Sequence, residues 1–218
     1  MQTPSSPPAS LAASCRTISE IVQTICDYTG DSRITINQIS EKTFDDIAET
    51  PELEGGLGRF YYDTDAAAII VCGDHLAPIH ESTLQFFVEV ATTAQNCLNT
   101  VTSCRVLMDG TSKADLYLDI ESKSPSLKGK QPDVSFMVIV DGNQVSSPYP
   151  TIVVEVGYSD TYDMLVKDVD AWLLGSLGYI RCAILIKLEK PAIDDDFGDI
   201  AKWTGFIEVY HLEAVQPE

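Results

Sequence analysis

The sequence predicts an α/β protein, a sandwich of helices around a mixed β-sheet. Apolar strands and amphipathic helices alternate along the second half of the 218-residue chain. One apolar strand, PTIVVEVG, is followed by a helix and then by the continuously apolar IRCAILI, which implies a crossover within one sheet. The hydrophobic content of 44% is sufficient for a sizeable core.

The N-terminal part is predicted to differ from the rest. Residues 1–13 are rich in Pro and Ser and predict a disordered tail. Residues 14–57 predict a helical extension, because CRTISEIVQTIC carries apolar residues at helical spacing and FDDIAET suits a short helix. The start of the chain lacks the pattern of a secretory signal, and no apolar run is long enough for a bilayer. We therefore expect an intracellular protein, cytoplasmic or nuclear, with no membrane partner.

Residues 58–218 are predicted to form the main domain. The stretch RFYYDTDAAAIIVCGD predicts two strands with a turn near residues 63–65. A long helix begins at Pro78 and carries an apolar stripe through Leu84, Phe87 and Ala91. The segment RVLMD and the strictly alternating KADLYLDI predict two further strands, the second of them half exposed.

The remaining elements follow in the same way. The segments PDVSFMVIVDGN and PTIVVEVG predict neighbouring strands, and TYDMLVKDVDAWLLGSLG predicts a helix with an apolar face. The stretches IRCAILIKLEK and FIEVYHLE predict the last two strands. The order after residue 77 is therefore helix, four strands, helix and two strands.

Two carboxylates stand at the ends of neighbouring predicted strands. Asp133 begins one strand and Glu155 lies near the end of the next, so an antiparallel pair would place both at one edge of the sheet. Hard oxygen ligands of this kind suit Mg²⁺ or Mn²⁺. The simpler interpretation is that each acid only faces water at a strand end. The six cysteines form no CxxC pair, which argues against a zinc site.

The stretch PDVSF, with Glu155 following Asp133 by 22 residues and a helix that bears Lys167, resembles the PD-(D/E)XK nuclease-like superfamily. The likeness is to its small stand-alone restriction-endonuclease-like members and covers roughly residues 58–212. It implies an αβββαβ sandwich around a mixed central sheet. It also implies that Asp133 and Glu155 hold the metal and that a lysine assists the attacking water. The family places that lysine two residues after the glutamate, where this chain has Gly157.

The resemblance leaves several site residues open. Lys167 could supply the missing lysine from the helix, although with Asp163 it also forms an ordinary exposed i, i+4 pair. Glu81 or Glu89 could supply a further acid from the first helix, but an exposed helix face explains both. His80 at the start of that helix suits packing or capping, and the Asp194–Asp196 run suits a solvated loop.

Two functions remain in view. The first is a metal-dependent phosphodiesterase that acts on nucleic acid with Mg²⁺ or Mn²⁺. The second is a catalytically diverged protein with the same fold, either a binding or scaffold module or an enzyme acting on a small-molecule ligand. A net charge of −19 disfavours nucleic acid, and only Lys123, Lys128 and Lys130 gather basic charge near Pro132. The helix around Trp172 could also serve a homo-oligomer interface.

Overall fold

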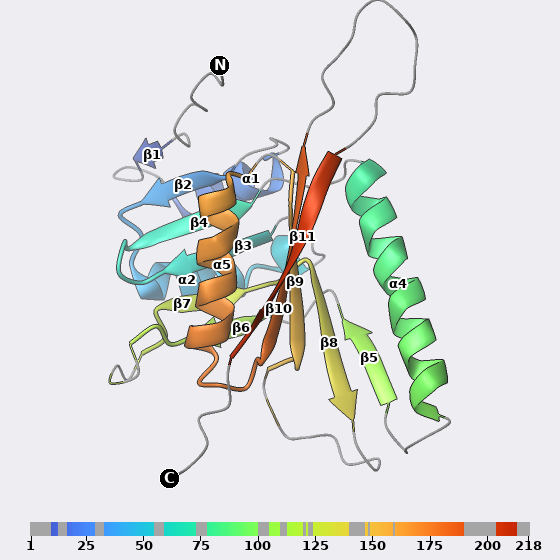
Figure 1. Cartoon of the computed structure of the whole chain (residues 1–218). Helices are drawn as coiled ribbons and strands as arrows, with labels where there is room; N and C mark the ends of the chain where they lie inside the picture. Colours follow the sequence, from blue (N-terminus) through green and yellow to red (C-terminus); the bar gives the residue numbers. More distant parts are fainter. Residues whose placement is uncertain are drawn as a thin grey trace, which may run out of the picture.

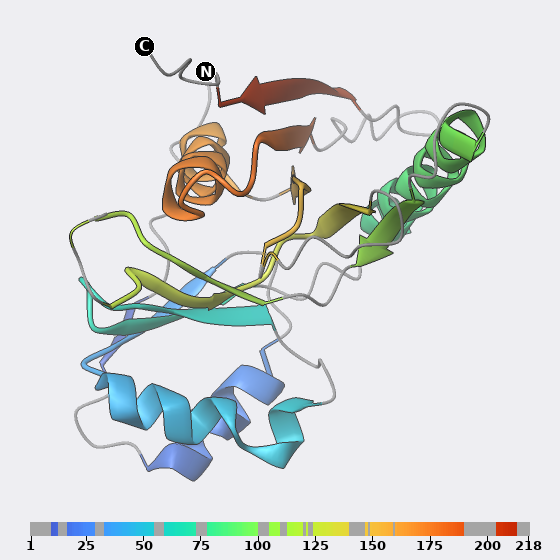
Figure 2. The same ribbon diagram turned by 90° about the horizontal axis from the view of Figure 1, so that it is seen from below.

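The computed structural model shows two β-sheets, each covered by helices. It describes residues 10–12, 17–28, 33–54, 59–72, 78–99, 105–109, 113–119, 121, 124–139, 147, 149–158, 160–189 and 204–212. The first sheet has six strands and the second has five. The helix α5 (Tyr162–Gly175) lies between the two sheets, as Figures 1 and 2 show.

The first sheet is built mainly from the N-terminal third of the chain. Its strand order is β1 (Ser10–Ala12), β2 (Ile34–Asn37), β4 (Ala68–Cys72), β3 (Arg59–Asp63), β7 (Leu127–Lys130) and β6 (Ala114–Leu116). Three helices cover one face of this sheet: α1 (Ile18–Cys26), α2 (Glu41–Ala48) and α3 (Pro51–Glu54). Apolar side chains from these helices and from β2, β3 and β4 form one buried cluster. The other face of the sheet is turned toward the second half of the chain.

The second sheet is a mixed sheet whose strands follow the chain in order. They are β5 (Arg105–Asp109), β8 (Val134–Ile139), β9 (Ile152–Gly157), β10 (Cys182–Glu189) and β11 (Thr204–His211). Strands β9 and β10 are parallel, and every other neighbouring pair is antiparallel. The parallel pair needs a crossover, and α5 (Tyr162–Gly175) supplies it.

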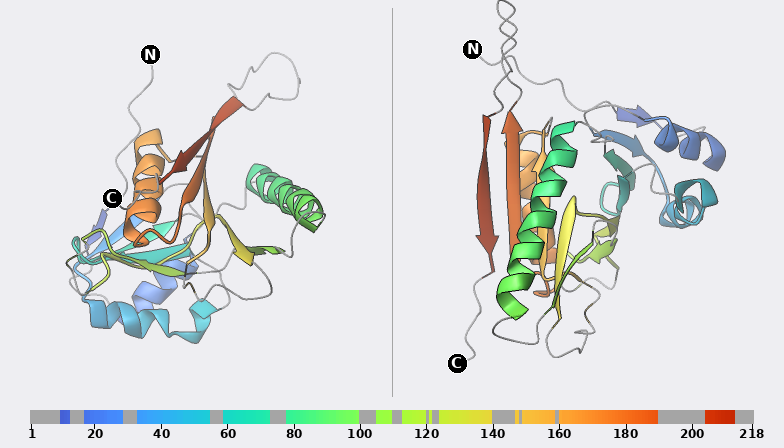
Figure 3. Two further views of the ribbon diagram at one scale, coloured as in Figure 1. Left: turned by 60° about the horizontal axis from the view of Figure 1, so that its bottom comes forward. Right: turned by 90° about the vertical axis from the view of Figure 1, so that its right-hand side faces the viewer.

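Two helices cover opposite faces of the second sheet. On one face, α5 packs its buried Leu165, Val169 and Trp172 against β9 and β10. On the other face, α4 (Pro78–Asn99) places Phe87 against Val134 and Phe136. Alternate residues of β9 therefore point to different helices. Figure 3 shows α4 across the sheet, on the side away from the first sheet.

Local sequence explains where two of the helices begin. Thr17 caps α1, where its side chain and that of Glu20 form a reciprocal capping box. Thr161 caps α5 and accepts a hydrogen bond from the backbone of Met164. Asp160, which precedes this cap, is buried. Because Thr161 forms the cap, the Asp160 carboxylate can make another contact.

The prediction of a mixed α/β protein is confirmed, but the single sheet is wrong. The short strands β1, β2, β6 and β7 join β3 and β4 in a sheet of their own. Residues 10–12 of the predicted disordered tail form β1, and the predicted helical extension also contributes β2. The alternating KADLYLDI forms a strand only over Ala114–Leu116, and that strand lies in the first sheet.

Apart from the KADLYLDI strand, the elements predicted after residue 77 form the second sheet and its two helices, with α4, β5, β8, β9, α5, β10 and β11 in sequence. Within the residues that the structure describes, no helix combines the length and apolar character needed to traverse a bilayer.

Candidate functional site

Asp133 and Glu155 lie side by side on neighbouring strands. Because β8 and β9 pair with Val134 opposite Val154, the next pair in register is Asp133 and Glu155. The backbone amide of Val156 donates a hydrogen bond to Asp133 Oδ2 at 2.6 Å, which fixes this carboxylate beside β9. Both acids are buried, at 8% and 3% exposure. The two acids are therefore neighbours, as the antiparallel pairing predicts. The simpler interpretation, that each acid only faces water at a strand end, is wrong because α5 and the first sheet bury both.

Arg59 of β3 contacts both carboxylates. Its guanidinium donates to Asp133 Oδ1, and Nη2 lies 3.9 Å from Glu155 Oε2. Nη2 also donates to the carbonyl of Gln131 at 2.8 Å. Alternation along β3 turns Arg59, Tyr61 and Asp63 away from the helices of the first sheet and toward the second. Two carboxylate oxygens thus converge on one cationic group.

Lys130, at the end of β7, is the second cation of the site. Its Nζ lies 2.8 Å from Asp168 Oδ1 and 3.9 Å from Glu155 Oε1. The ammonium also stands over the ring of Tyr61, at 4.7 Å from its centroid. The indole of Trp172 donates a hydrogen bond to the same oxygen, Glu155 Oε1, at 2.5 Å. Lys130 therefore joins the acid of β9 to the acid of α5.

Arg33, just before β2, extends the network to the start of α5. Its guanidinium donates to Asp168 Oδ2, and Nε lies 3.1 Å from Asp160 Oδ1. Asp168 therefore binds one cation with each oxygen. This position of Asp168, on the buried side of α5, follows from the helical spacing that also buries Leu165 and Trp172.

The charges of this network are divided between the two sheets. All three cations, Arg33, Arg59 and Lys130, come from the first sheet or its connections, whereas the four acids, Asp133, Glu155, Asp160 and Asp168, come from the second sheet and α5. Three cations balance three carboxylates, so the network is neutral when one carboxyl group holds a proton. We call these seven residues the ion network.

Glu155 is the carboxyl group that favours the proton. Its complete burial raises its pKa to about 8, and the nearby acids Asp133 and Asp168 add to the shift, against Lys130 and Arg59, which lower it. Burial would raise the pKa of Asp168 as well, but Lys130 and Arg33 outweigh it and hold that pKa below its usual value. Burial would lower the pKa of Lys130, yet Asp168 and Glu155 raise it above normal.

Gly157 stands where the family pattern has lysine, and the packing explains its size. A Cβ atom at this position would lie 2.3 Å from Cδ1 of the buried Leu165. Real side chains do not approach this closely, so a larger residue at position 157 would force the Leu165 side chain out of its present place. A lysine at this position would displace the Leu165 side chain from its contact with β9.

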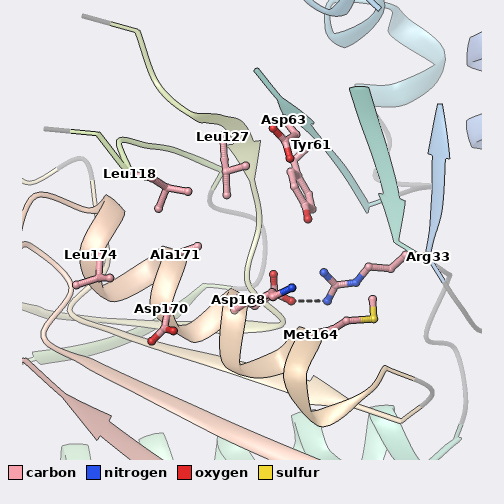
Figure 4. Close-up of a pocket in the computed structure, with 11 residues that line it drawn as sticks. Arg33, Tyr61, Asp63, Leu118, Leu127, Met164, Asp168, Asp170, Ala171 and Leu174 are labelled. Carbon is pink, nitrogen blue, oxygen red and sulfur yellow. Dashed lines mark hydrogen bonds and ion pairs between the residues drawn. The ribbon is translucent and has the colours of Figure 1, made fainter. Parts of the chain in front are cut away.

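Lys167 lies outside the ion network. It is exposed on α5 and lines a cleft of about 520 Å³ between that helix and the first sheet. Figure 4 shows the cleft, in which Tyr61, Leu118 and Leu127 face Asp168, Ala171 and Leu174 of α5. The structure thus brings Asp133 and Glu155 together and places Lys130, rather than Lys167, beside Glu155.

Two other candidates that the structure describes contribute nothing to the ion network. Glu89 is exposed on α4, and Lys128 pairs with Glu41 and Asp45 of α2. The side chains of His80 and Glu81, the Asp194–Asp196 run and Lys123 lie outside the described residues. Among the described residues, no third acid, histidine or cysteine joins the pair to make a ready metal-binding group.

Sequence reasoning missed Arg33, Arg59, Asp160, Asp168 and Trp172 as members of the site. One signal was available for Asp168, because a charged residue on the apolar side of a helix needs a buried partner. Arg59 carried no such signal, since it begins an ordinary alternating strand 74 residues before Asp133.

The chain was also compared with known proteins. No protein-family model matches it, and no curated protein shows significant similarity to it.

Proposed function

We propose that the protein is a metal-dependent phosphodiesterase of the PD-(D/E)XK nuclease-like class, with an αβββαβ unit made of α4, β5, β8, β9, α5 and β10. The observation that carries the proposal is the pairing of Asp133 and Glu155 across β8 and β9, with the ammonium of Lys130 at 3.9 Å from Glu155. The order of elements along the second sheet supports the same class.

The donor set fits a divalent cation. Asp133 Oδ1 and Glu155 Oε2 both face the guanidinium of Arg59, so these two hard oxygens already stabilise one positive group. Mg²⁺ or Mn²⁺ held by them would supply a Lewis acid and activate water for attack on phosphorus. Lys130 would stabilise negative charge near Glu155, and Trp172 orients the Glu155 carboxylate. Arg59 must release the acids for this to happen.

The direct test combines metal binding with hydrolysis. Calorimetric titration with Mn²⁺ should detect binding to the wild type, and Asp133→Asn should weaken it at least about tenfold. Arg59→Met should strengthen binding, because the competing guanidinium is gone. Asp65→Asn is the matched control, since Asp65 is exposed on the β3–β4 turn. Absence of Mn²⁺ binding in both the wild type and Arg59→Met would contradict the proposal.

Hydrolysis is measured on single- and double-stranded oligonucleotides with Mg²⁺ or Mn²⁺. Comparison of Lys130→Met with Lys167→Met identifies the lysine that assists. Loss of cleavage with Lys130→Met alone supports the present assignment, whereas loss with Lys167→Met alone gives the role to Lys167. Each variant is first checked for an unchanged circular dichroism spectrum, because Lys130 is buried in the ion network.

The second candidate is a diverged protein that keeps the fold but binds no metal. Arg59 favours it, since its guanidinium satisfies both acids without a metal ion. The net charge of −19 also disfavours a polyanionic substrate. For this candidate, Mn²⁺ leaves the melting temperature unchanged and oligonucleotides remain intact.

A further inference from the structure

The cleft between α5 and the first sheet has the size and lining of a small-molecule site. Its volume of about 520 Å³ lies in the usual range for ligand pockets, roughly 300–1,000 Å³. Its walls are apolar side chains from both sides, namely Leu118, Leu127, Met164, Ala171 and Leu174. Two of these, Leu118 and Leu174, are about half exposed, at 47% and 59%. A ligand between them would cover apolar surface that now faces water.

The deep end of the cleft is polar. Tyr61 extends from β3 into the cavity, with its hydroxyl near the Arg33–Asp168 ion pair (Figure 4). Among the described residues, this hydroxyl has no hydrogen-bond partner. Burial raises the pKa of Tyr61 to about 12, so the group stays neutral and can both donate and accept. The cleft therefore offers donors and acceptors at its floor and apolar walls above.

The charges of the lining disfavour an anion. Asp63, Asp168 and Asp170 outnumber the two cations, Arg33 and Lys167. The Arg33 guanidinium is already paired with Asp160 and Asp168, and so cannot bind a phosphate without giving up these partners. The complementary ligand is an uncharged molecule with an apolar body and hydrogen-bonding groups, a description that a nucleobase meets.

The cleft adjoins the proposed catalytic acids. Asp168 lines its floor and binds Lys130, whose Nζ is also 3.9 Å from Glu155. A ring in the cleft would thus contact Asp168, and the Lys130 side chain would connect Asp168 to Glu155. From this geometry we infer that the cleft is a base-binding subsite, which takes one unpaired nucleobase of a nucleic acid while its phosphate stays outside. The choice of a nucleobase rests on the proposed phosphodiesterase function. Entry between α5 and the sheet requires a base that is not paired.

Free nucleosides test the inference without metal or catalysis. Adenosine, guanosine, cytidine and uridine are titrated separately into the full-length protein in EDTA, and amide NMR shifts are followed. At least one nucleoside should bind saturably, with a dissociation constant on the order of 1 mM or below. The shifts should concentrate at Leu127 and Ala171, and the corresponding 5′-monophosphate should bind more weakly.

Two variants and a control locate the binding. Leu118→Trp places an indole in the mouth of the cleft and should weaken nucleoside binding at least about fivefold. Tyr61→Phe removes only the hydroxyl and should weaken it about threefold or more. Leu107→Trp is the control, because Leu107 is equally exposed, at 48%, but lies on β5 and does not line the cleft.

The inference is overturned by any of three results: no nucleoside shifts these amides, Leu118→Trp binds as well as the wild type, or the monophosphate binds more tightly. Failure of the phosphodiesterase is a separate outcome. Asp133→Asn weakens metal binding in that proposal but should leave nucleoside affinity unchanged. Nucleoside binding without any cleavage would therefore refute the hydrolytic function and retain the subsite.

Discussion

The indole of Trp172 donates its hydrogen bond to Glu155 Oε1 over 2.5 Å, and this bond ties α5 to the centre of β9. Trp172 is fully buried, and its ring also lies 5.5 Å from the Lys130 ammonium. The aromatic residue that the helical pattern places in the core thus also orients an acid of the candidate site. Trp172 therefore contributes both to the packing of the core and to the hydrogen bonding of Glu155. Substitution of Trp172 tests these contributions.

Trp172→Phe should destabilise the protein by about 2–4 kcal/mol. The variant loses the hydrogen bond to a buried carboxyl group and leaves a cavity beside Lys130. Urea denaturation followed by circular dichroism measures the change. Tyr179→Phe, at a position 52% exposed, should change stability by less than about 0.5 kcal/mol. Equal stability of Trp172→Phe and the wild type would show that the bond to Glu155 contributes nothing.

Glu155→Gln should remove a pH dependence of stability. The folded protein holds the Glu155 proton up to about pH 8, whereas the unfolded chain releases it near pH 4.5. The folded state binds more protons in this window, so its stability falls as pH rises, by at most about 1.4 kcal/mol per pH unit. The glutamine variant should therefore gain stability relative to the wild type between pH 5 and pH 8, which denaturant titrations at several pH values measure. A constant difference across the window would contradict the raised pKa.

Lys130→Met and Lys128→Met should differ widely. Removal of the buried Lys130 leaves Asp168 and Glu155 without their shared cation and should destabilise the fold by about 3–5 kcal/mol. Lys128, two residues earlier, pairs with the half-exposed Glu41 and Asp45, and its loss should change stability by less than about 1 kcal/mol. Thermal and urea unfolding of both variants provide the comparison. Similar effects for the two lysines would rule out a tightly coupled ion network.

Gly157→Ala should destabilise the protein through a collision with α5. The added methyl group would meet Cδ1 of Leu165 at 2.3 Å, and the buried Leu165 side chain would have to move. Combination with Leu165→Val should recover part of the loss, so the two substitutions should be non-additive by about 0.5–2 kcal/mol in a double-mutant cycle. Additive effects would mean that the close approach of Gly157 to Leu165 does not limit the packing.

The strands of the second sheet could be predicted because their signals are local. Continuous apolar runs mark β9 and β10, and the connecting helix has a clear apolar face. The neighbourhood of Asp133 and Glu155 followed from the antiparallel order of β8 and β9 alone. Their burial did not, because the first sheet that covers them is assembled from short strands distant in sequence.

The cations of the site could not be found from local patterns. Arg59 reaches Asp133 across 74 residues, and Arg33 reaches Asp168 across 135. Lys130 was noticed as part of a basic loop, but its position at the end of β7 turns it inward. Lys167 was the helix lysine that the resemblance favoured, yet the turn of α5 that buries Asp168 exposes its neighbour. Contacts between residues distant in sequence decide which charges meet, and a short stretch of sequence does not contain both partners.

The division of charge between the two sheets has a consequence for how the chain can be cut. A fragment from Pro78 onward contains every strand and helix of the second sheet, and its sequence order suggests an independent unit. Such a fragment lacks Arg33 and Arg59, and its β7 has lost β3, the strand beside which it lies. Its acids would repel one another in the absence of these counterions. We therefore expect the N-terminal third to be needed for folding of the second half, so that a boundary drawn ahead of α4 would divide one folding unit.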